Sequence, residues 1–370
     1  MNFLFDEDQD ALRDAARKLL ADKATLEAFH KHMEAGSTHD AELWGLMAEN
    51  GYLGIGIPEE FGGAGMGALN QVVVAEELGY CLAHTPYTAS ISGAAEAIML
   101  AGSETQKQAH LPGLASGELI GTIAYFEANG RHDAAGMQAQ VKNGKLTGTK
   151  VPVMDAEIAD FAVVSAQDER GALSLYIVRL DQPGIKRQSI KTIELHRKLA
   201  EVQFDQVEAE LLGGQGSGAE LLDQLLNRMA ILVAFEQLGG AQRCLEMARD
   251  YALERYIFGR PLGTYQGIKH RISDMYMRIE LARSNCFFGA WALNSSPEDL
   301  PEAAALARGA ACDAYEFAAQ ENLHVHGGIG FTWEANCHMF VKRMRLLDAL
   351  LGGRMLWRER LFKALQAKAA

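Results

Sequence analysis

Several common signals are missing from this sequence of 370 residues, and each absence excludes a class of protein. Cysteine is scarce and irregular: the five cysteines form no C-x-x-C pair, so neither a disulfide framework nor a zinc or other metal site is expected. We predict buried thiols in a reducing compartment. Positive charge is also in short supply, because the formal net charge is −13, and this argues against wholesale nucleic-acid binding.

Long apolar runs are missing as well. No stretch reaches the roughly 20 apolar residues that a membrane helix requires, so no membrane association is expected. The N-terminus is acidic from residue 6, whereas a secretion signal would be basic and then apolar. Because 48% of the chain is hydrophobic, we predict a globular cytoplasmic protein with two or three domains.

Residues 1–117 are predicted to form an N-terminal helical domain. Asp40 provides a helix start signal, and Gly51 provides the glycine that commonly follows a helix end. Further helical patterns occur at about 68–80 and 90–101.

Residues 118–215 are predicted to form a middle β domain, because the hydrophobic period changes there from 3.6 to 2. Short alternating runs such as KLTGTKV, FAVVSA and LSLYIV are separated by turn residues. Asn143 and Gly144 stand between two of these runs, and this pair favours a type I′ hairpin turn, in which both residues have positive φ.

Residues 216–370 are predicted to form a C-terminal bundle of long helices. Periodic apolar patterns extend over four stretches, 219–256, 266–294, 300–325 and 334–366. Helices of this length commonly pack nearly antiparallel, and their spare apolar faces often serve oligomerisation. The sequence therefore predicts a fold that is mostly α with a central β domain.

Three local motifs in this order resemble the acyl-CoA dehydrogenase family, and the resemblance covers essentially the whole chain. GYLGIGIPEEFGGAGMG (51–67) resembles the N-terminal signature of the family. EQLGGAQRCLEMARDYALERYIFGRPLGTYQ (236–266) and HGGIGFTWE (326–334) resemble its two C-terminal signatures. The resemblance implies the acyl-CoA dehydrogenase fold, with an N-terminal helical domain, a barrel-like middle β domain and a C-terminal four-helix bundle.

The resemblance also implies a tetrameric flavoprotein that uses FAD to oxidise an acyl-CoA thioester to its trans-2-enoyl form. Electrons would pass to an acceptor that is similar to electron-transfer flavoprotein. In this chemistry a carboxylate removes the proton α to the carbonyl, hydrogen bonds stabilise the enolate, and hydride leaves the β carbon for the flavin.

Seven residues match positions that contact the nucleotide end of FAD in the family: Arg255, Phe258, Tyr265, Gln266, His324, Gly327 and Gly328. The arginine matches the one that pairs with the pyrophosphate, and the two glycines match those that let FAD approach the backbone. His324 stands where the family commonly has glutamine. In family tetramers these elements hold the FAD of the neighbouring subunit.

The flavin-ring end of the site would be held by the middle domain of the same chain, and there the sequence departs from the family. The usual loop T-E-P-G-A-G-S-D is replaced by FEANGRHD at 126–133. Its intruding residues are Phe126, Arg131 and His132.

A second departure lies at 151–155, where VPVMD replaces the family pattern M-W-I-T-N. Pro152 and Met154 take the places of the tryptophan and the threonine that face the flavin ring. Proline removes a backbone donor and the aromatic wall is lost, so this ring pocket is predicted to be poor. Ordinary drift in a working site is the alternative.

Two positions carry the catalytic glutamate in different branches of the family, and this sequence has Leu351 at one and Met229 at the other. Neither side chain accepts a proton, so the catalytic residue stays unknown. Asp348 is a weak candidate, because on a continuous helix it would point about 60° away from Leu351.

Three functions are compatible with this pattern. The chain is a self-sufficient homotetrameric dehydrogenase with an unrecognised base, or the base-lacking subunit of an α2β2 heteromer, or a repurposed relative that hydrates an enoyl-CoA or binds without turnover. We favour the second, similar to dehydrogenases of steroid side-chain thioesters, with a homologous catalytic subunit as partner. Random decay would not spare the elements that serve a neighbour while it alters the others. The acyl group and the acceptor stay open.

Overall fold

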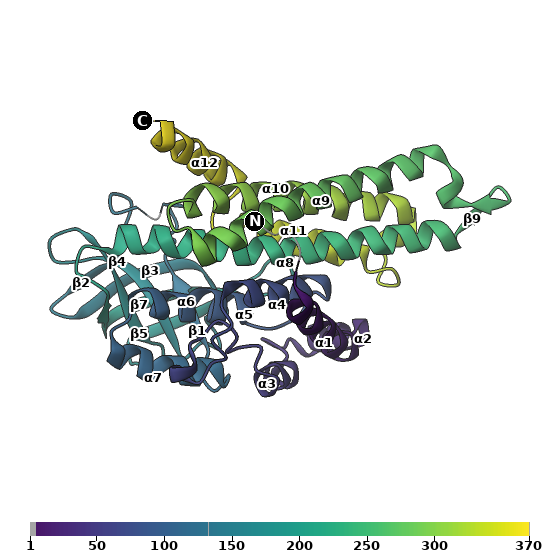
Figure 1. The fold of residues 1–370 in the computed structure, drawn as a ribbon. Coiled ribbons are helices and arrows are strands. Elements are labelled where there is room, and N and C mark those ends of the chain that lie inside the picture. The colour runs from purple at the N-terminus through teal and green to yellow at the C-terminus, as the bar shows by residue number, and fades with distance from the viewer. Residues whose placement is uncertain (1–4, 132, 370) are drawn as a thin grey trace. The chain divides into compact units, whose positions relative to one another are not determined.

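The structure is a computed structural model that describes residues 5–131 and 133–369. It divides into two compact units, one within 1–25, 68–83 and 230–370 and the other within 26–67 and 84–229. The predicted order of helices, then strands, then helices is confirmed (Figure 1). The predicted domain boundaries at 117 and 215 stay predictions.

The unit formed by 26–67 and 84–229 contains an eight-stranded mixed sheet in the order β6-β7-β3-β2-β4-β5-β8, with β1 paired to β4. Its strands are β1 (Gly121–Ala124), β2 (Gln140–Lys142), β3 (Lys145–Met154), β4 (Phe161–Gln167), β5 (Leu173–Arg179), β6 (Ile185–Ile190), β7 (Leu199–Glu208) and β8 (Glu210–Leu212). Asn143 and Gly144 have φ of 51° and 71°, so the predicted hairpin turn between β2 and β3 is confirmed.

The helices of this unit are short. They are α2 (Leu26–Ala35), α3 (Ala41–Glu49), η1 (Glu59–Phe61), α5 (Tyr87–Ala89), the π-helical segment η2 (Ser90–Ala95), α6 (Glu96–Ala101) and α7 (Glu104–Ala115). The predicted start signal is confirmed, because the Asp40 carboxylate accepts a hydrogen bond of 2.9 Å from the amide of Leu43 in the first turn of α3.

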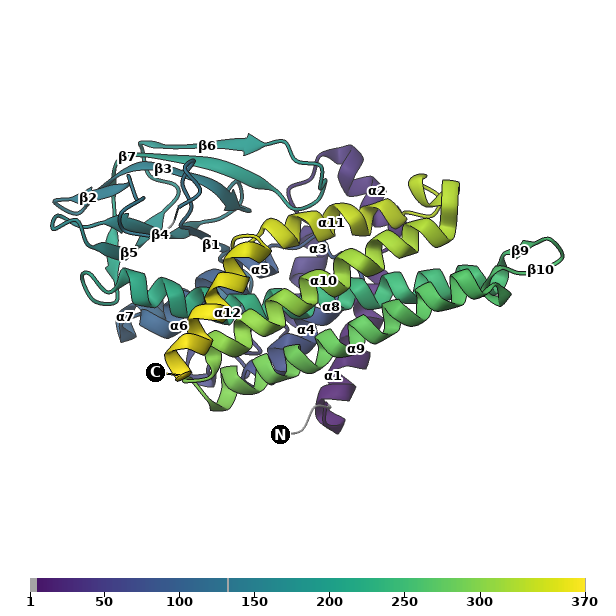
Figure 2. The same cartoon turned by 90° about the horizontal axis from the view of Figure 1, so that it is seen from above.

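The other unit is a helical bundle with a small hairpin. Its elements are α1 (Glu7–Lys23), α4 (Ala68–Tyr80), most of α8 (Gly218–Glu254), β9 (Tyr256–Ile257), β10 (Arg260–Pro261), η3 (Leu262–Thr264), α9 (Gln266–Ser295), α10 (Leu300–His326), η4 (Gly327–Phe331), α11 (Cys337–Ala349) and α12 (Arg354–Ala369). Figure 2 shows α8, α9 and α10 running beside one another, with the β9–β10 hairpin beyond the ends of α8 and α9.

Two glycines let α4 and α8 approach each other until their backbones touch. A Cβ built on Gly79 would lie 1.8 Å from the carbonyl oxygen of Glu236, and one on Gly239 would lie 1.8 Å from that of Glu76. No other residue fits at either position without a backbone shift. Beside this crossing the buried carboxylate of Glu76 pairs with Arg283 at 2.7 Å.

The prediction of one helix over 334–366 is wrong, because the structure has two helices there. α11 ends at Ala349 and α12 begins at Arg354. Leu351 has φ of 62° and Gly352 has φ of 83°, and a right-handed helix cannot continue through two residues in the left-handed region.

All five cysteines are free thiols, and four of them are buried, as predicted; Cys81 is partly exposed. Within the ranges that the structure describes, none of the helices has both the length and the apolar character needed to span a membrane. The cytoplasmic location stays a prediction.

Candidate functional site

The β9–β10 hairpin follows directly after α8 and carries two of the predicted nucleotide-binding residues. Phe258 and Gly259 form its turn, with φ of 48° and 78°. The Phe258 side chain is 94% exposed, although phenylalanine is among the residues most often buried. Arg255, just before β9, is exposed and forms no ion pair within the described part of the chain. The hairpin therefore presents an exposed aromatic ring at its tip and an exposed cation without an ion pair at its base.

Tyr265 fixes the hairpin to the start of α9. Its hydroxyl donates a hydrogen bond of 3.1 Å to the carbonyl oxygen of Ile257, and the Arg260 guanidinium lies 3.9 Å from the centre of its ring. Gln266, the first residue of α9, is exposed, and no side chain caps this helix end. Free amides at a helix N-terminus favour an anion.

The end of α10 lies at the same end of the bundle. The His326 ring stacks on the ring of Tyr251, near the end of α8, with centroids 4.2 Å apart. Gly327 has φ of 64° and ends α10, so this glycine also serves to terminate the helix. His324 is exposed, and its Nδ1 lies 3.4 Å from the carboxylate of Glu321.

The residues at this end of the bundle fit a dinucleotide chain. A Cβ built on Gly327 or Gly328 would meet no atom within 4 Å, so the backbone there is open to close approach. A cavity of about 300 Å³ is lined by Ile268, Arg271, His324 and Val325, from the start of α9 and the end of α10. The structure thus brings all seven predicted positions to one end of the bundle.

The loop predicted to face the flavin ring is anchored by a buried ion pair. The Glu127 carboxylate accepts hydrogen bonds from the amides of Gln138 (2.7 Å) and Ala139 (3.0 Å) and from Lys150 Nζ (2.9 Å). Burial lowers the pKa of Lys150 to about 8. Burial would raise the pKa of Glu127, but the amide donors and the lysine outweigh it, and the pKa lies below its ordinary value.

The rest of this loop closes on itself. Arg131 Nε donates a hydrogen bond of 2.9 Å to the Asp133 carboxylate, and Asn129 donates one of 2.7 Å to the carbonyl oxygen of Gly136. A Cβ built on Gly136 would lie 2.4 Å from that of Arg131, so the arginine folds directly over the glycine. His132, the third intruding residue, lies outside the described residues.

Strand β3 is irregular at 151–155 (VPVMD), the segment that is predicted to face the flavin ring. Its register against β7 shifts between Lys150 and Val153, and Pro152 lies within this shift, where it interrupts no ladder hydrogen bond. The amide of Val151 donates a hydrogen bond of 3.0 Å to the carbonyl oxygen of Phe126. The two departing segments are thus joined to each other, and they offer few free donors to a ring.

The two predicted base positions hold apolar side chains that are fully buried. Leu351 and Met229 are both 0% exposed. Leu351 lies in the break between α11 and α12, so the geometry of a continuous helix does not relate it to Asp348.

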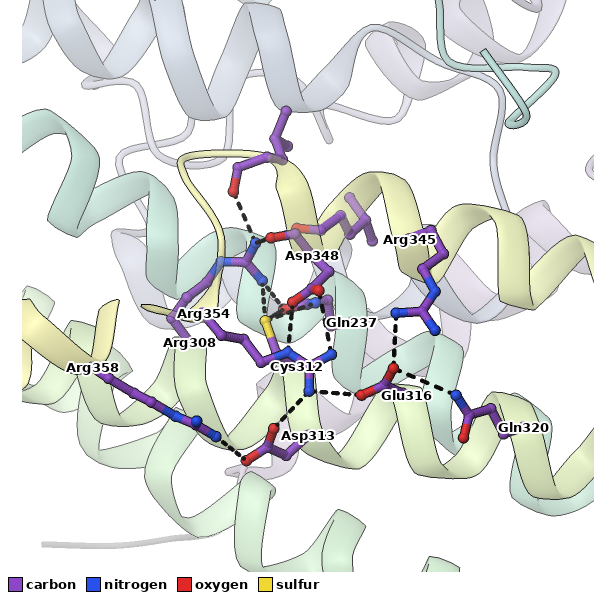
Figure 3. Close-up of polar contacts among 12 residues, drawn as sticks. Gln237, Arg308, Cys312, Asp313, Glu316, Gln320, Arg345, Asp348, Arg354 and Arg358 are labelled. Atoms are coloured by element: carbon purple, nitrogen blue, oxygen red, sulfur yellow. Dashed lines mark hydrogen bonds and ion pairs between the residues drawn. The ribbon is translucent and has the colours of Figure 1, made fainter. Parts of the chain in front are cut away.

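Asp348 is engaged by an arginine. Its carboxylate pairs with Arg354 Nε at 3.0 Å (Figure 3). Burial would raise the pKa of Asp348, but the hydrogen bonds and the charge of Arg354 outweigh it and hold the pKa below the ordinary value. A carboxylate with a lowered pKa is a weak base toward a carbon acid.

Two buried cations near these segments, Lys150 and Arg308, were missed by the sequence reasoning. Lys150 stands directly before VPVMD, on an alternating strand where an inward charge needs a partner, and this signal was available. Arg308 is one of the largest fully buried side chains, on a helix whose sequence gives no sign of it. No cluster of metal-ligating side chains occurs within 5–131 and 133–369.

Comparisons with known proteins give a consistent result. Residues 6–118 match the family model for the N-terminal domain of acyl-CoA dehydrogenase, and residues 216–365 match the model for its C-terminal domain. The chain is 32% identical to acyl-CoA dehydrogenase IpdE2 of Mycobacterium tuberculosis over 338 residues, which cover 91% of each protein.

Two similar solved structures are assemblies of two different proteins. One is a variant of the Tcur3481–Tcur3483 steroid ACAD, with a TM-score of 0.89, 30% identity, and coverage of 98% of this chain and 99% of that chain. The other is the ChsE4–ChsE5 complex from Mycobacterium tuberculosis, with a TM-score of 0.90, 27% identity and 99% coverage of both chains.

Proposed function

Because this chain belongs to the acyl-CoA dehydrogenase family, we propose that it is the non-catalytic subunit of an α2β2 acyl-CoA dehydrogenase. Members of the family are FAD-dependent oxidoreductases that act on the CH–CH bond of an acyl-CoA thioester. In the proposed assembly, this chain binds the nucleotide end of the FAD whose flavin ring lies in a homologous catalytic subunit. That subunit supplies the base.

The observation that carries the proposal is the state of the two base positions. Leu351 and Met229 are apolar and completely buried, and Asp348 is held by Arg354. A general base commonly contributes on the order of 10²–10⁴ in rate, and a proton α to a thioester is too weak an acid to be removed without one. A chain without a base can therefore contribute to this reaction by binding part of the FAD that a catalytic subunit uses.

The hairpin supports the same division of labour. Covering an exposed phenylalanine ring with a partner is favourable, because its apolar surface is then removed from water. Phe258 is 94% exposed, and Arg255 beside it has no carboxylate partner within the described residues. A phosphate-bearing ligand held against a second subunit would satisfy both, because the guanidinium binds two phosphate oxygens at once.

The ring end offers less. FAD, when bound, accepts the hydride from the β carbon of the substrate. The described segments that would face its ring are joined by the hydrogen bond from Val151 to Phe126, Pro152 has no donor, and Arg131 is paired with Asp133. The chain therefore has residues that fit the nucleotide end of FAD but few that fit the flavin ring. This difference supports one working site per pair of subunits.

The similarity to two assemblies built from unlike chains also supports a heteromer. One of them is described as a steroid enzyme, so the substrate class that we propose is a CoA thioester of a steroid side chain. Electrons would leave for an acceptor similar to electron-transfer flavoprotein.

The experiment compares the chain purified alone with the chain co-expressed with a candidate catalytic acyl-CoA dehydrogenase of the same organism. FAD per polypeptide and thioester oxidation are measured for each. We expect little FAD and slight turnover for the chain alone, and about one FAD per pair of chains with full activity for the complex. Stoichiometric FAD and robust oxidation by the chain alone would instead establish the self-sufficient homotetramer.

A matched pair of variants tests the role of the hairpin in the complex. Arg255→Gln removes the predicted phosphate contact, whereas Arg249→Gln removes an exposed arginine of α8 that is paired with Asp250 at 2.7 Å. We expect Arg255→Gln alone to release FAD from the complex. Equal FAD content in both variants would contradict the proposal, and hydration of an enoyl-CoA by the wild-type chain would indicate a repurposed relative.

A further inference from the structure

The break between α11 and α12 is held by a buried arginine that belongs to neither helix. Arg308 lies on α10 and is 0% exposed. Its charge helps to lower the pKa of the Asp348 carboxyl group, but no ion pair within 4.0 Å of a carboxylate is found for it in the described ranges, and its Nε has no hydrogen-bond partner there. A buried cation without a direct ion pair is unfavourable unless its donors are satisfied in another way.

The acceptors of Arg308 are mostly the last carbonyl groups of α11. Its Nη2 donates to the carbonyl oxygens of Leu347, Asp348 (3.4 Å) and Leu350 (2.9 Å). Figure 3 shows Arg308 beside Asp348. Carbonyls at a helix C-terminus have no partner within the helix, and the helix dipole favours a positive charge there. The guanidinium thus replaces the amides that another helical turn would have supplied.

The other nitrogen of the guanidinium ties this helix end to the bundle. Nη1 donates to the side-chain oxygen of Gln237 and to the Cys312 sulfur, the latter at 2.9 Å. α8, α10 and the end of α11 therefore meet at one side chain. An ammonium group, with a single nitrogen, could not reach both sets of acceptors.

Leu351, the next residue, has a conformation that needs such support. A non-glycine residue with φ of 62° is strained, and strain of this kind persists only where the surroundings enforce it. On its other side Trp357 Nε1 donates a hydrogen bond of 3.2 Å to the Leu351 carbonyl oxygen. Arg354 adds ion pairs to Asp348 and Asp313, each at 3.0 Å (Figure 3).

We propose that Arg308 is a positioning residue for residue 351: it ends α11 and holds the following backbone in the left-handed conformation. The side chain at 351 is then presented from a rigid junction, whether or not it is an acid. The inference shares with the proposed function the assignment of 351 to a family base position.

The test measures strain at 351 with two variants that both delete the leucine side chain, Leu351→Gly and Leu351→Ala. Glycine adopts positive φ without cost, whereas alanine does not, so the glycine variant should melt about 2 °C higher. When Arg308→Met or Arg308→Lys is added, the backbone should relax and this difference should vanish. A merely structural role of Arg308 would lower both melting temperatures and leave their difference unchanged.

The matched control is Arg343→Met, because Arg343 is also a fully buried arginine of this bundle and its guanidinium lies 3.5 Å from the Glu236 carboxylate. It should destabilise the chain and preserve the difference between glycine and alanine. The inference is overturned if glycine is no better than alanine with Arg308 present, or if lysine at 308 preserves the difference. Neither flavin nor a partner takes part, so failure of the proposed function leaves this test intact.

Discussion

Replacing Lys150 with methionine should destabilise the β domain, because it leaves a carboxylate buried without its cation. Lys150 is completely buried, and its Nζ lies 2.9 Å from the Glu127 carboxylate, whose side chain is 5% exposed. Removing one partner of a buried ion pair commonly costs about 3–5 kcal/mol. Glu127 keeps its two amide donors, so we expect about 3 kcal/mol, or a fall of roughly 6–12 °C in melting temperature.

The effect should depend on pH with a definite sign. In the native protein the pKa of Glu127 is lowered, so its contribution to stability is present above the ordinary pKa and is lost as the pH falls. Without the lysine, burial should raise the pKa of Glu127, and the buried charge is then relieved by protonation as the pH falls. The free energy of unfolding of Lys150→Met should therefore approach that of the wild-type chain as the pH falls from 7.5 toward 4.5.

The assay is thermal or urea unfolding at several pH values, with Lys150→Met/Glu127→Gln as the control. The double variant has no buried charge at this site and should recover most of the lost stability at pH 7.5. A pH-independent loss, or a double variant as unstable as Lys150→Met, would refute the account of an uncompensated carboxylate and would indicate lost packing instead.

Three further predictions concern other parts of the chain. Gly239→Ala places a Cβ 1.8 Å from the Glu76 carbonyl oxygen and should cost more than about 3 kcal/mol, whereas Gly309→Ala, with no atom within 4 Å of its Cβ, should be neutral or stabilising in unfolding experiments. Phe258→Asn gives the hairpin a residue that tolerates positive φ, so the melting temperature of the chain should not change. The FAD content of the complex should nevertheless fall, because the aromatic ring is lost. Asp348→Asn should lower stability at pH 7, and the loss should shrink as the pH falls below the ordinary pKa of the carboxyl group, because a carboxylate whose pKa is lowered loses its contribution on acidification; chemical denaturation over a series of pH values measures this.

The sequence predicted those parts of the fold that depend on local chemistry. The start of α3 at Asp40 and the turn at Asn143 each require a particular residue type, and the structure has both where they were expected. It did not reveal β6 (Ile185–Ile190), because IKRQSI is charged and its middle residues are exposed. That strand forms because β7 (Leu199–Glu208), the next strand along the chain, offers it an edge to pair with, and this pairing leaves no apolar alternation in IKRQSI itself.

The same contrast holds at the candidate site. The hairpin residues from Arg255 to Gln266 were predicted from the resemblance to the family's motif, and the structure brings them to one end of the bundle. The buried cation Arg308 was not found, because its partners are backbone carbonyls of another helix, and a carbonyl belongs to every residue. Sequence patterns identify side chains that meet a ligand more readily than those that support them.

The break at Leu351 shows why this support matters to the interpretation. Apolar periodicity favours one helix through 334–366, and a helix of that kind would place Asp348 and Leu351 on neighbouring faces with no strain. The structure instead has a strained leucine at this predicted base position, between the acceptors of Arg308 and the ion pairs of Arg354. Strain of this kind persists only where the surroundings enforce it, and here the enforcing contacts come from Arg308, Arg354 and Trp357. The conformation of residue 351 therefore depends on side chains that the apolar periodicity of 334–366 does not reveal.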